Sequence, residues 1–265
     1  EEKEMPTIKI NIDYLKTVNY ALYHNRIPVC QSVELTNTLQ RNIGDVRVVC
    51  EGEYMSQSES DLIEQIATGD TLRIAPFDIA PDVNRLASLT ERIITSFTLK
   101  VMGGDEVVAQ ENYEIELMPY DHWLGSRILP QTITSFVMPN HPAIEALIPQ
   151  VGAMLKQMTG TSALIEYQSG NSNDVRAQVA AAFATVHQQG VVYRSMPASY
   201  EVIGQRVTMP DQVLAKKLGN CIELTLLMAS VLENIGINTV VIFQKGHAYL
   251  GVWLVDDCRS EEHTS

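Results

Sequence analysis

A cysteine and a histidine near the end of the chain have the types and spacing of a nucleophile and its base. Cys221 opens an apolar stretch, "GNCIELTLLMASVLENIG" at 219–236, and His247 follows in "QKGHAYLGVWLVDD" at 244–257. A thiolate can attack an acyl carbon atom, while a nearby imidazole accepts the proton and later returns it. The alternative is that Cys221 packs in the core as a small apolar side chain. The pair indicates acyl-transfer chemistry only if the fold brings both side chains to one place.

The apolar stretch carries the signals of a helix that begins at Cys221. Asn220 is a suitable N-cap, and Glu223 completes an Asn-x-x-Glu variant of the capping box, so Asn220 is counted as a supporting residue of the site. At the first helical position the thiol lies beside unpaired backbone N–H groups, and the positive end of the helix dipole favours its thiolate form. Gly236 is expected to end the helix.

Two strands are expected to follow this helix. The segments "NTVVIF" and "HAYLGVWLV" are rich in β-branched and aromatic residues, and "QKG" between them is typical of a turn. In this arrangement His247 begins the second strand, which can then lie along the tip of the helix. The predicted elements are therefore able to place the imidazole close to the thiol.

With these residues in place, the segment at 205–254 resembles a known family. The stretch "QRVTMPDQVLAKKLGNCIELTLLMASVLENIGINTVVIFQKGHAYLGVWL" is similar to the core of the transglutaminase-like superfamily. More narrowly, it resembles the transglutaminase-like region near the N-terminus of large bacterial helicase-related proteins. The resemblance implies a papain-like core in which Cys221 is the nucleophile and His247 the base. It also implies a third residue, usually an aspartate on the following strand, that orients the histidine.

Neither Asp256 nor Asp257 fits the role of this third residue. Both follow His247 along a strand, which places them roughly 30 Å away at about 3.3 Å per residue. Asp256 also has the wrong parity for the same face of the sheet. The last seven residues, "RSEEHTS" at 259–265, are interpreted as a non-native tail. We therefore expect the third residue downstream of the given sequence, and an unpaired strand edge near residues 248–255, with Asp211 and Glu223 as the alternatives within the chain.

An acyl-transfer site also needs donors for the oxyanion that forms during attack. The backbone N–H of Cys221 is a natural donor. Gln205 and Gln212 precede the nucleophile, and either side chain can supply a second N–H group. The alternative for both glutamines is an ordinary surface position.

The rest of the chain predicts an α+β protein with two domains. Residues 1–16 are assigned to an N-terminal extension, and residues 17–120 alternate in strand fashion, which favours a β-sandwich of Ig-like architecture. Residues 121–258 are assigned to an incomplete transglutaminase-like domain. Within them, helices are expected at 143–158, interrupted by Pro149, and at 174–189 with Asn173 as N-cap. His187 in the last turn of the second helix is interpreted as a cation that suits the helix dipole.

Composition limits the partners. The net charge is −13, so this segment is not expected to bind nucleic acid except through further downstream domains. No CxxC pair, phosphate-binding loop or dinucleotide fingerprint is present, and neither a metal nor a cofactor is expected. No apolar run reaches membrane-spanning length and no signal peptide is recognised, so a cytoplasmic location is expected, with Cys30 and Cys50 as reduced thiols buried in strands.

Together these observations favour a cysteine hydrolase or acyltransferase that acts on amide or related acyl bonds of a protein or peptide. The alternative function is a non-catalytic interaction or sensing module of a helicase- or nuclease-type protein. Such a module keeps the fold and uses it to bind a partner. A third residue that completes the site favours the enzyme, and its absence from the whole protein favours the module.

Overall fold

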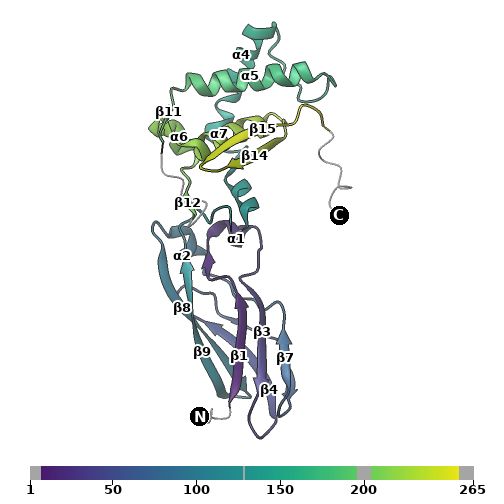
Figure 1. The fold of residues 1–265 in the computed structure, drawn as a ribbon, viewed down its shortest axis with the longest axis vertical. Coiled ribbons are helices and arrows are strands. Elements are labelled where there is room, and N and C mark those ends of the chain that lie inside the picture. The colour runs from purple at the N-terminus through teal and green to yellow at the C-terminus, as the bar shows by residue number, and fades with distance from the viewer. Residues whose placement is uncertain (1–6, 128, 196–203, 257–265) are drawn as a thin grey trace. The chain divides into compact units, whose positions relative to one another are not determined.

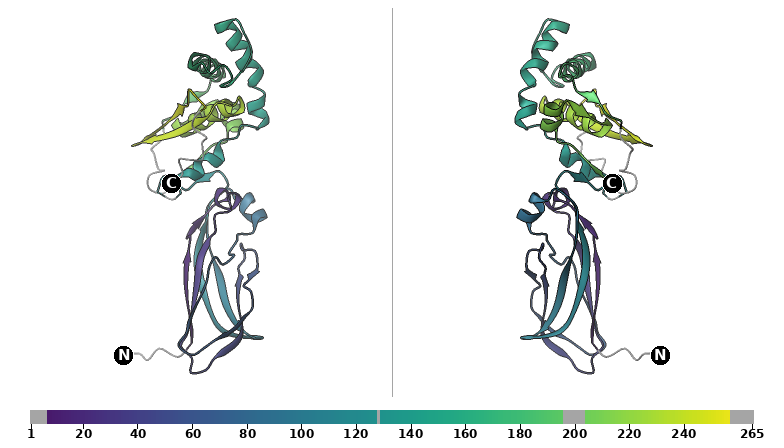
Figure 2. Two further views of the ribbon diagram at one scale, coloured as in Figure 1. Left: turned by 90° about the vertical axis from the view of Figure 1, so that its right-hand side faces the viewer. Right: turned by 90° about the vertical axis from the view of Figure 1, so that its left-hand side faces the viewer.

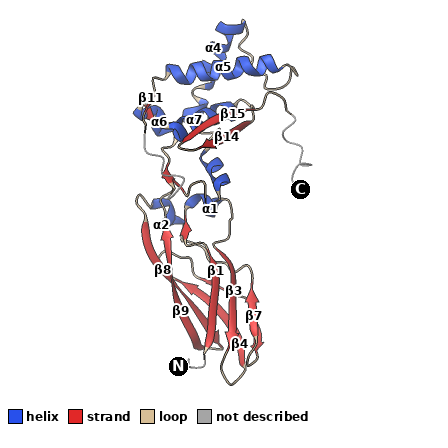
Figure 3. Ribbon diagram, viewed as in Figure 1, coloured by secondary structure: helices blue, strands red, loops and turns tan. Residues whose placement is uncertain are grey.

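The computed structural model describes residues 7–127, 129–195 and 204–256, and the chain forms two compact units, Glu1–His122 and Trp123–Ser265 (Figure 1). The protein is a mixed structure of helices and several sheets. Most of the long strands belong to the first unit and most of the helical residues to the second (Figure 3). No helix in the described ranges has the length and apolar character that crossing a membrane requires.

The first unit contains two sheets. The larger sheet has the order β2-β9-β8-β4-β5, and β6 also pairs with β4. Its strands are β2 (Thr17–Val18), β4 (Ile43–Glu51), β5 (Ser58–Glu59), β6 (Ile63–Ile66), β8 (Ile93–Gly103) and β9 (Glu106–Leu117). The smaller sheet has the order β1-β3-β7, with β1 (Ile8–Tyr14), β3 (Cys30–Asn37) and β7 (Thr71–Ile74). Two short helices, α1 (Tyr20–His24) and α2 (Val83–Ser88), join strands of this unit.

Aromatic side chains from the two sheets meet inside the first unit. The ring of Tyr14 on β1 meets the edge of Phe97 on β8 at a centroid distance of 5.5 Å, and that of Tyr113 on β9 at 5.8 Å. Such edge-to-face contacts add to the free energy of burial itself. Cys30 and Cys50 are fully buried free thiols in β3 and β4, as the sequence predicts.

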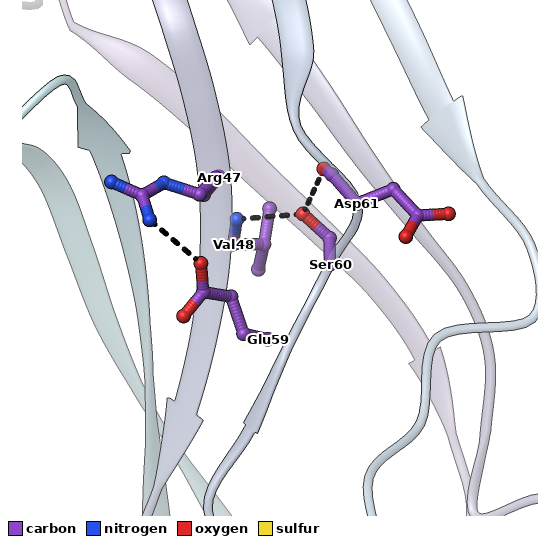
Figure 4. Close-up of polar contacts among 5 residues, drawn as sticks. All are labelled: Arg47, Val48, Glu59, Ser60 and Asp61. Atoms are coloured by element: carbon purple, nitrogen blue, oxygen red, sulfur yellow. Dashed lines mark hydrogen bonds and ion pairs between the residues drawn. The ribbon is translucent and has the colours of Figure 1, made fainter.

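Polar contacts at the margin of the larger sheet extend the pairing of β4 beyond the two residues of β5 (Figure 4). Ser60 accepts a hydrogen bond from the Val48 N–H at its side-chain oxygen, 3.0 Å away, and its own N–H donates to the Val48 carbonyl at 2.9 Å. Beside it, the Arg47 guanidinium forms an exposed ion pair with Glu59 at 3.0 Å. An exposed pair contributes little, so the serine contacts carry most of this local pairing.

The start of the first unit lies earlier than residue 17. Residues 8–14, assigned from the sequence to an extension, form β1 and pair antiparallel with β3, Ile8 opposite Asn37 and Ile12 opposite Val33. The physical reason is the alternation of Ile8, Ile10 and Ile12, of which Ile8 and Ile10 are buried. An alternating apolar segment finds its lowest free energy on a sheet face. The boundary after His122 lies two residues beyond the expected position.

The second unit is built mainly of helices. Strand β10 (His122–Trp123) lies at the boundary, and the other elements are η1 (Pro130–Phe136), α3 (Pro142–Glu145), α4 (Ile148–Thr159), α5 (Ser172–Gln188), β11 (Val192–Tyr193), β12 (Gln205–Arg206), α6 (Pro210–Lys216), β13 (Leu218–Gly219), α7 (Cys221–Asn234), β14 (Thr239–Gln244) and β15 (His247–Val252). The break between α3 and α4 precedes Pro149, as the sequence predicts. Helix α5 begins earlier than expected, because its N-cap is Asn171 rather than Asn173. The Asn171 side chain accepts the Asn173 N–H at 3.0 Å.

Helix α7 is the centre of the second unit. Leu227, Val231 and Leu232 are fully buried in a cluster that includes residues from α3, α4, α5 and α6. The hairpin β14–β15 packs on α7, and Figure 2 shows it as a layer distinct from α5. Its strands pair from Thr239 opposite Val252 to Gln244 opposite His247. The position of β15 along α7 therefore sets the position of His247.

The end of α7 is fixed by Gly236. This residue has φ +78°, and the Ile237 N–H donates to the Leu232 carbonyl at 2.9 Å while the Gly236 N–H donates to Glu233 at 3.1 Å. These are the two hydrogen bonds of a Schellman motif. The Glu166 side chain lies against Gly236, in space that a Cβ atom would need.

We predict that Gly236→Ala lowers the free energy of unfolding by about 2 kcal/mol or more, because backbone strain and the collision with Glu166 add together. Gly160→Ala is the matched control, since Gly160 also has positive φ but open space around it, and it should cost only ~1 kcal/mol. Urea-unfolding midpoints measure both. Glu166→Ala should recover part of the loss in the Gly236→Ala background, and equal losses for both glycine variants would contradict the collision.

Candidate functional site

The start of α7 is held by a buried hydrogen-bond network. The Asn220 side chain accepts the Glu223 N–H at 3.0 Å, and the Glu223 carboxylate accepts the Asn220 N–H at 2.8 Å, so the predicted capping box is present. The other carboxylate oxygen accepts the Thr208 N–H at 2.9 Å. Asn220 and Glu223 are each 3% exposed. Cys221 therefore sits at the first position of a firmly anchored helix, with its thiol partly exposed.

His247 begins β15 at an exposed position. The next residue, Ala248, is buried, and its carbonyl accepts a hydrogen bond from the Thr225 hydroxyl on α7 at 3.4 Å. This contact fixes the beginning of the strand against the first turns of the helix. The imidazole stacks loosely on Tyr249, with ring centroids 6.4 Å apart.

Cys221 and His247 line the same cavity, whose volume is about 970 Å³. Its floor is formed by α7 through Leu224, Thr225 and Met228, one wall is β15, and the opposite wall is α5. Among the described contacts no hydrogen bond joins the Cys221 sulfur to the imidazole, so the two residues line one cavity without being hydrogen-bonded to each other. Cys221 at the N-terminus of α7 and His247 at the start of β15 therefore border one apolar space.

A second histidine that the sequence analysis assigned to the helix dipole lines the same cavity. His187 does lie in the last turn of α5, and it stacks on Phe183 with centroids 6.3 Å apart. In the sequence the signal that points to it is only a large apolar residue, Phe183, one turn earlier on the same helix face. In the structure Phe183 is 63% exposed, so this face of α5 is not covered by the core.

Carboxylates near the site are engaged elsewhere. Asp256 accepts a hydrogen bond from the Asn238 amide at 3.3 Å, Glu223 belongs to the cap, and Asp211 lies in the first turn of α6. The ion pairs found among the described residues do not include His247. Asp257, Cys258 and the tail at 259–265 lie outside the described residues.

The outer edge of β15 has no strand partner within the described part of the chain. The hairpin is a two-stranded sheet in which β15 pairs with β14 alone. Just past the strand, Trp253 is 46% exposed, and its carbonyl accepts a hydrogen bond from the Tyr167 hydroxyl at 3.0 Å. An edge of this kind leaves backbone N–H and C=O groups free to pair.

The expected side-chain donors for an oxyanion do not line the cavity. Gln205 is 8% exposed in β12, and the Gln212 carbonyl oxygen accepts the Lys216 ammonium at 3.1 Å on α6. The Asn220 amide nitrogen is buried without a hydrogen-bond partner among the described atoms, but it is closed to solvent and cannot reach a substrate. The N–H groups of Cys221 and Ile222, which lack partners within the helix, are better placed.

We predict that Cys221 is alkylated by iodoacetamide at neutral pH at least about ten times faster than Cys30 or Cys50. Burial raises the pKa of Cys30 to about 11 and that of Cys50 to about 12, so both remain protonated and shielded. A Cys258→Ser background simplifies the measurement, which is peptide mass spectrometry over time. Faster labelling of either strand cysteine would show that the thiol at α7 is inert.

The cap of α7 gives a second prediction. Glu223→Ala removes two hydrogen bonds to a buried carboxylate, and we expect a loss of roughly 2 to 4 kcal/mol in the free energy of unfolding. Gln212→Ala is the control, because it removes only a contact with Lys216 on the helix surface and should change stability by about 0.5 kcal/mol or less. Urea titration followed by circular dichroism measures both, and similar losses would contradict the anchoring role.

Comparison with known proteins does not assign the chain to a family. No family model and no curated protein matches the chain. The case for a function therefore rests on the geometry of the cavity and on the residues at 205–254.

Proposed function

We propose that the second unit is a transglutaminase-like cysteine hydrolase or acyltransferase that acts on amide or related acyl bonds. The observation that carries the proposal is the shared cavity, which Cys221 lines from the N-terminus of α7 and His247 from the start of β15. The resemblance at 205–254 supports the same roles, with Cys221 as nucleophile and His247 as base. In this proposal the second unit has a papain-like core and the first is an Ig-like β-sandwich.

The reaction begins with transfer of the Cys221 proton to the imidazole. The thiolate attacks the acyl carbon, and the N–H groups of Cys221 and Ile222 bind the oxyanion. When the C–N bond breaks, the imidazolium gives its proton to the leaving amine, and a thioester remains. Water, or a second amine, then attacks the thioester while His247 takes its proton. The C–S bond breaks, the carboxylic acid or the new amide leaves, and the imidazolium returns the proton to the Cys221 sulfur.

The proposed mechanism requires that His247 be positioned beside the Cys221 thiol. His247 is exposed and shares no hydrogen bond with the Cys221 sulfur among the described contacts, so the proposed proton transfer requires the imidazole to be held at the thiol. A carboxylate on a strand beside β15 would hold it there, and the open edge of β15 is the place for such a strand. We place this strand, and the helicase-related part of a larger cytoplasmic bacterial protein, outside the described residues.

A second candidate is a non-catalytic interaction or sensing module. What favours it is the open geometry, because the Cys221 sulfur and the His247 imidazole share no hydrogen bond and the described residues supply His247 with no carboxylate. In that case Cys221 is a partly exposed residue without a catalytic role, and the cavity only binds a partner.

Acylation by p-nitrophenyl acetate tests the proposal, because an activated thiolate displaces nitrophenolate from this ester without a specific substrate. We predict a burst of nitrophenolate and one acetyl group on the peptide that contains Cys221. Cys221→Ser should remove the burst, and His247→Gln should slow it about a hundredfold. Stopped-flow absorbance and peptide mass spectrometry measure these outcomes.

His187→Gln is the matched control, since it removes an imidazole from the opposite wall of the same cavity. It should leave the burst unchanged. If His247→Gln changes neither the burst nor the iodoacetamide labelling of Cys221, the non-catalytic module is the better account. If His187→Gln has the larger effect, the base is on α5 and the assignment of His247 is wrong.

A further inference from the structure

The cavity beside Cys221 is a groove with two distinct ends. Strand β11 pairs with β13, which directly precedes Cys221, so the C-terminal end of α5 with His187 lies toward the thiol. At the other end, the Gln178 side chain on α5 accepts hydrogen bonds from the N–H groups of Ile165 and Glu166. The neighbouring Tyr167 hydroxyl donates a hydrogen bond to the carbonyl of Trp253, just beyond β15. Helix α5 and strand β15 therefore run in opposite directions along the groove (Figure 1).

The length of the groove follows from α5. Arg176 and His187 both line it, and the helix between them rises about 16 Å. A polypeptide in extended conformation covers this distance with roughly five residues. The groove thus reaches from the thiol to Arg176 over the length of a short strand.

The groove is apolar and open. Four of the large apolar side chains that are exposed on this protein line it, Met158, Phe183, Tyr193 and Tyr249, and their exposed fractions lie between 37% and 63%. Exposed apolar side chains gathered in this way are typical of a binding surface.

The charge in the groove is opposite in sign to that of the protein as a whole. The chain has a net charge of −13, yet among the described residues that line the groove the one charged side chain is that of Arg176, and no aspartate or glutamate is present. Arg176 is exposed and donates only to neutral partners, the Ser172 hydroxyl at 3.2 Å and the Asn173 amide oxygen at 3.3 Å. A permanently charged guanidinium without a carboxylate partner in the described structure is suited to bind one.

The geometry points to an extended, acidic polypeptide as the occupant of this groove. Its apolar side chains enter the cavity, and a carboxylate binds Arg176. This inference rests on the proposed function in one respect. The acyl group that Cys221 attacks lies about five residues from the acidic residue.

Selection from a displayed library of random octapeptides tests the occupant without assuming a sequence. The bait is the full chain with Cys221→Ser, so that binding is measured in the absence of acylation. We expect enrichment of peptides with alternating apolar residues and an aspartate or glutamate, and loss of the acidic preference with Arg176→Gln. Lys156→Gln is the control, because it makes the same charge change on the exposed face of α4 that lines a different cavity.

The selected peptide, labelled with a fluorophore, then gives binding by anisotropy. Replacement of its acidic residue by glutamine should weaken binding about fivefold or more, and Arg176→Gln should remove that difference. A failed acetylation burst with intact binding would overturn the proposed function and leave this inference standing.

Three outcomes would overturn the inference. One is the absence of any enrichment over the Arg176→Gln bait, and another is enrichment of basic or purely apolar peptides. The third is loss of enrichment in a longer form of the natural chain, which would mean that a downstream segment of the same chain fills the groove.

Discussion

The buried carboxylate of Glu223 is the contact on which the site depends. Burying a charged group costs free energy unless it is hydrogen-bonded, and Glu223 accepts the N–H groups of Asn220 and Thr208. Its position in the first turn of α7 adds the favourable field of the helix dipole. The carboxylate thereby joins the segment before α6 to the start of the central helix. It fixes the backbone on both sides of Cys221, which lies between Asn220 and Glu223 along the chain.

The three described cysteines differ because Cys221 lies at the start of a helix and the other two lie on buried strands. Cys30 and Cys50 lie on strands inside the first unit, where desolvation raises the pKa of each thiol. For Cys50, the nearby Cys30 adds to this effect, and the Ser58 hydroxyl opposes it. Cys221 is at a helix N-terminus and partly exposed, so a reagent can reach it, whereas burial in strands shields Cys30 and Cys50. Position in the fold, rather than residue type, separates a structural thiol from a candidate nucleophile.

The sequence was sufficient to predict those features that depend only on residues close together along the chain. The capping box of Asn220 and Glu223, the break before Pro149 and the hairpin ahead of His247 each depend on neighbouring residues, and each is present. The missed features depend on tertiary packing. Strand β1 gains its place only by pairing with β3, and His187 joins the site only because α5 lies across the groove from β15. Gln205 and Gln212 were candidates by order along the chain, which says nothing about the direction of a side chain.

One geometric constraint connects the proposed chemistry with the groove. Residues along a strand alternate in direction, and Ala248 lies against α7, so His247 starts from the side of β15 that is turned away from the helix core. A strand added to the outer edge of β15 changes this setting, because it covers one side of the imidazole and lowers the dielectric around it. In the proposed mechanism, pairing of that strand at the edge and positioning of His247 are then parts of one event, while the acyl group comes from the polypeptide in the groove.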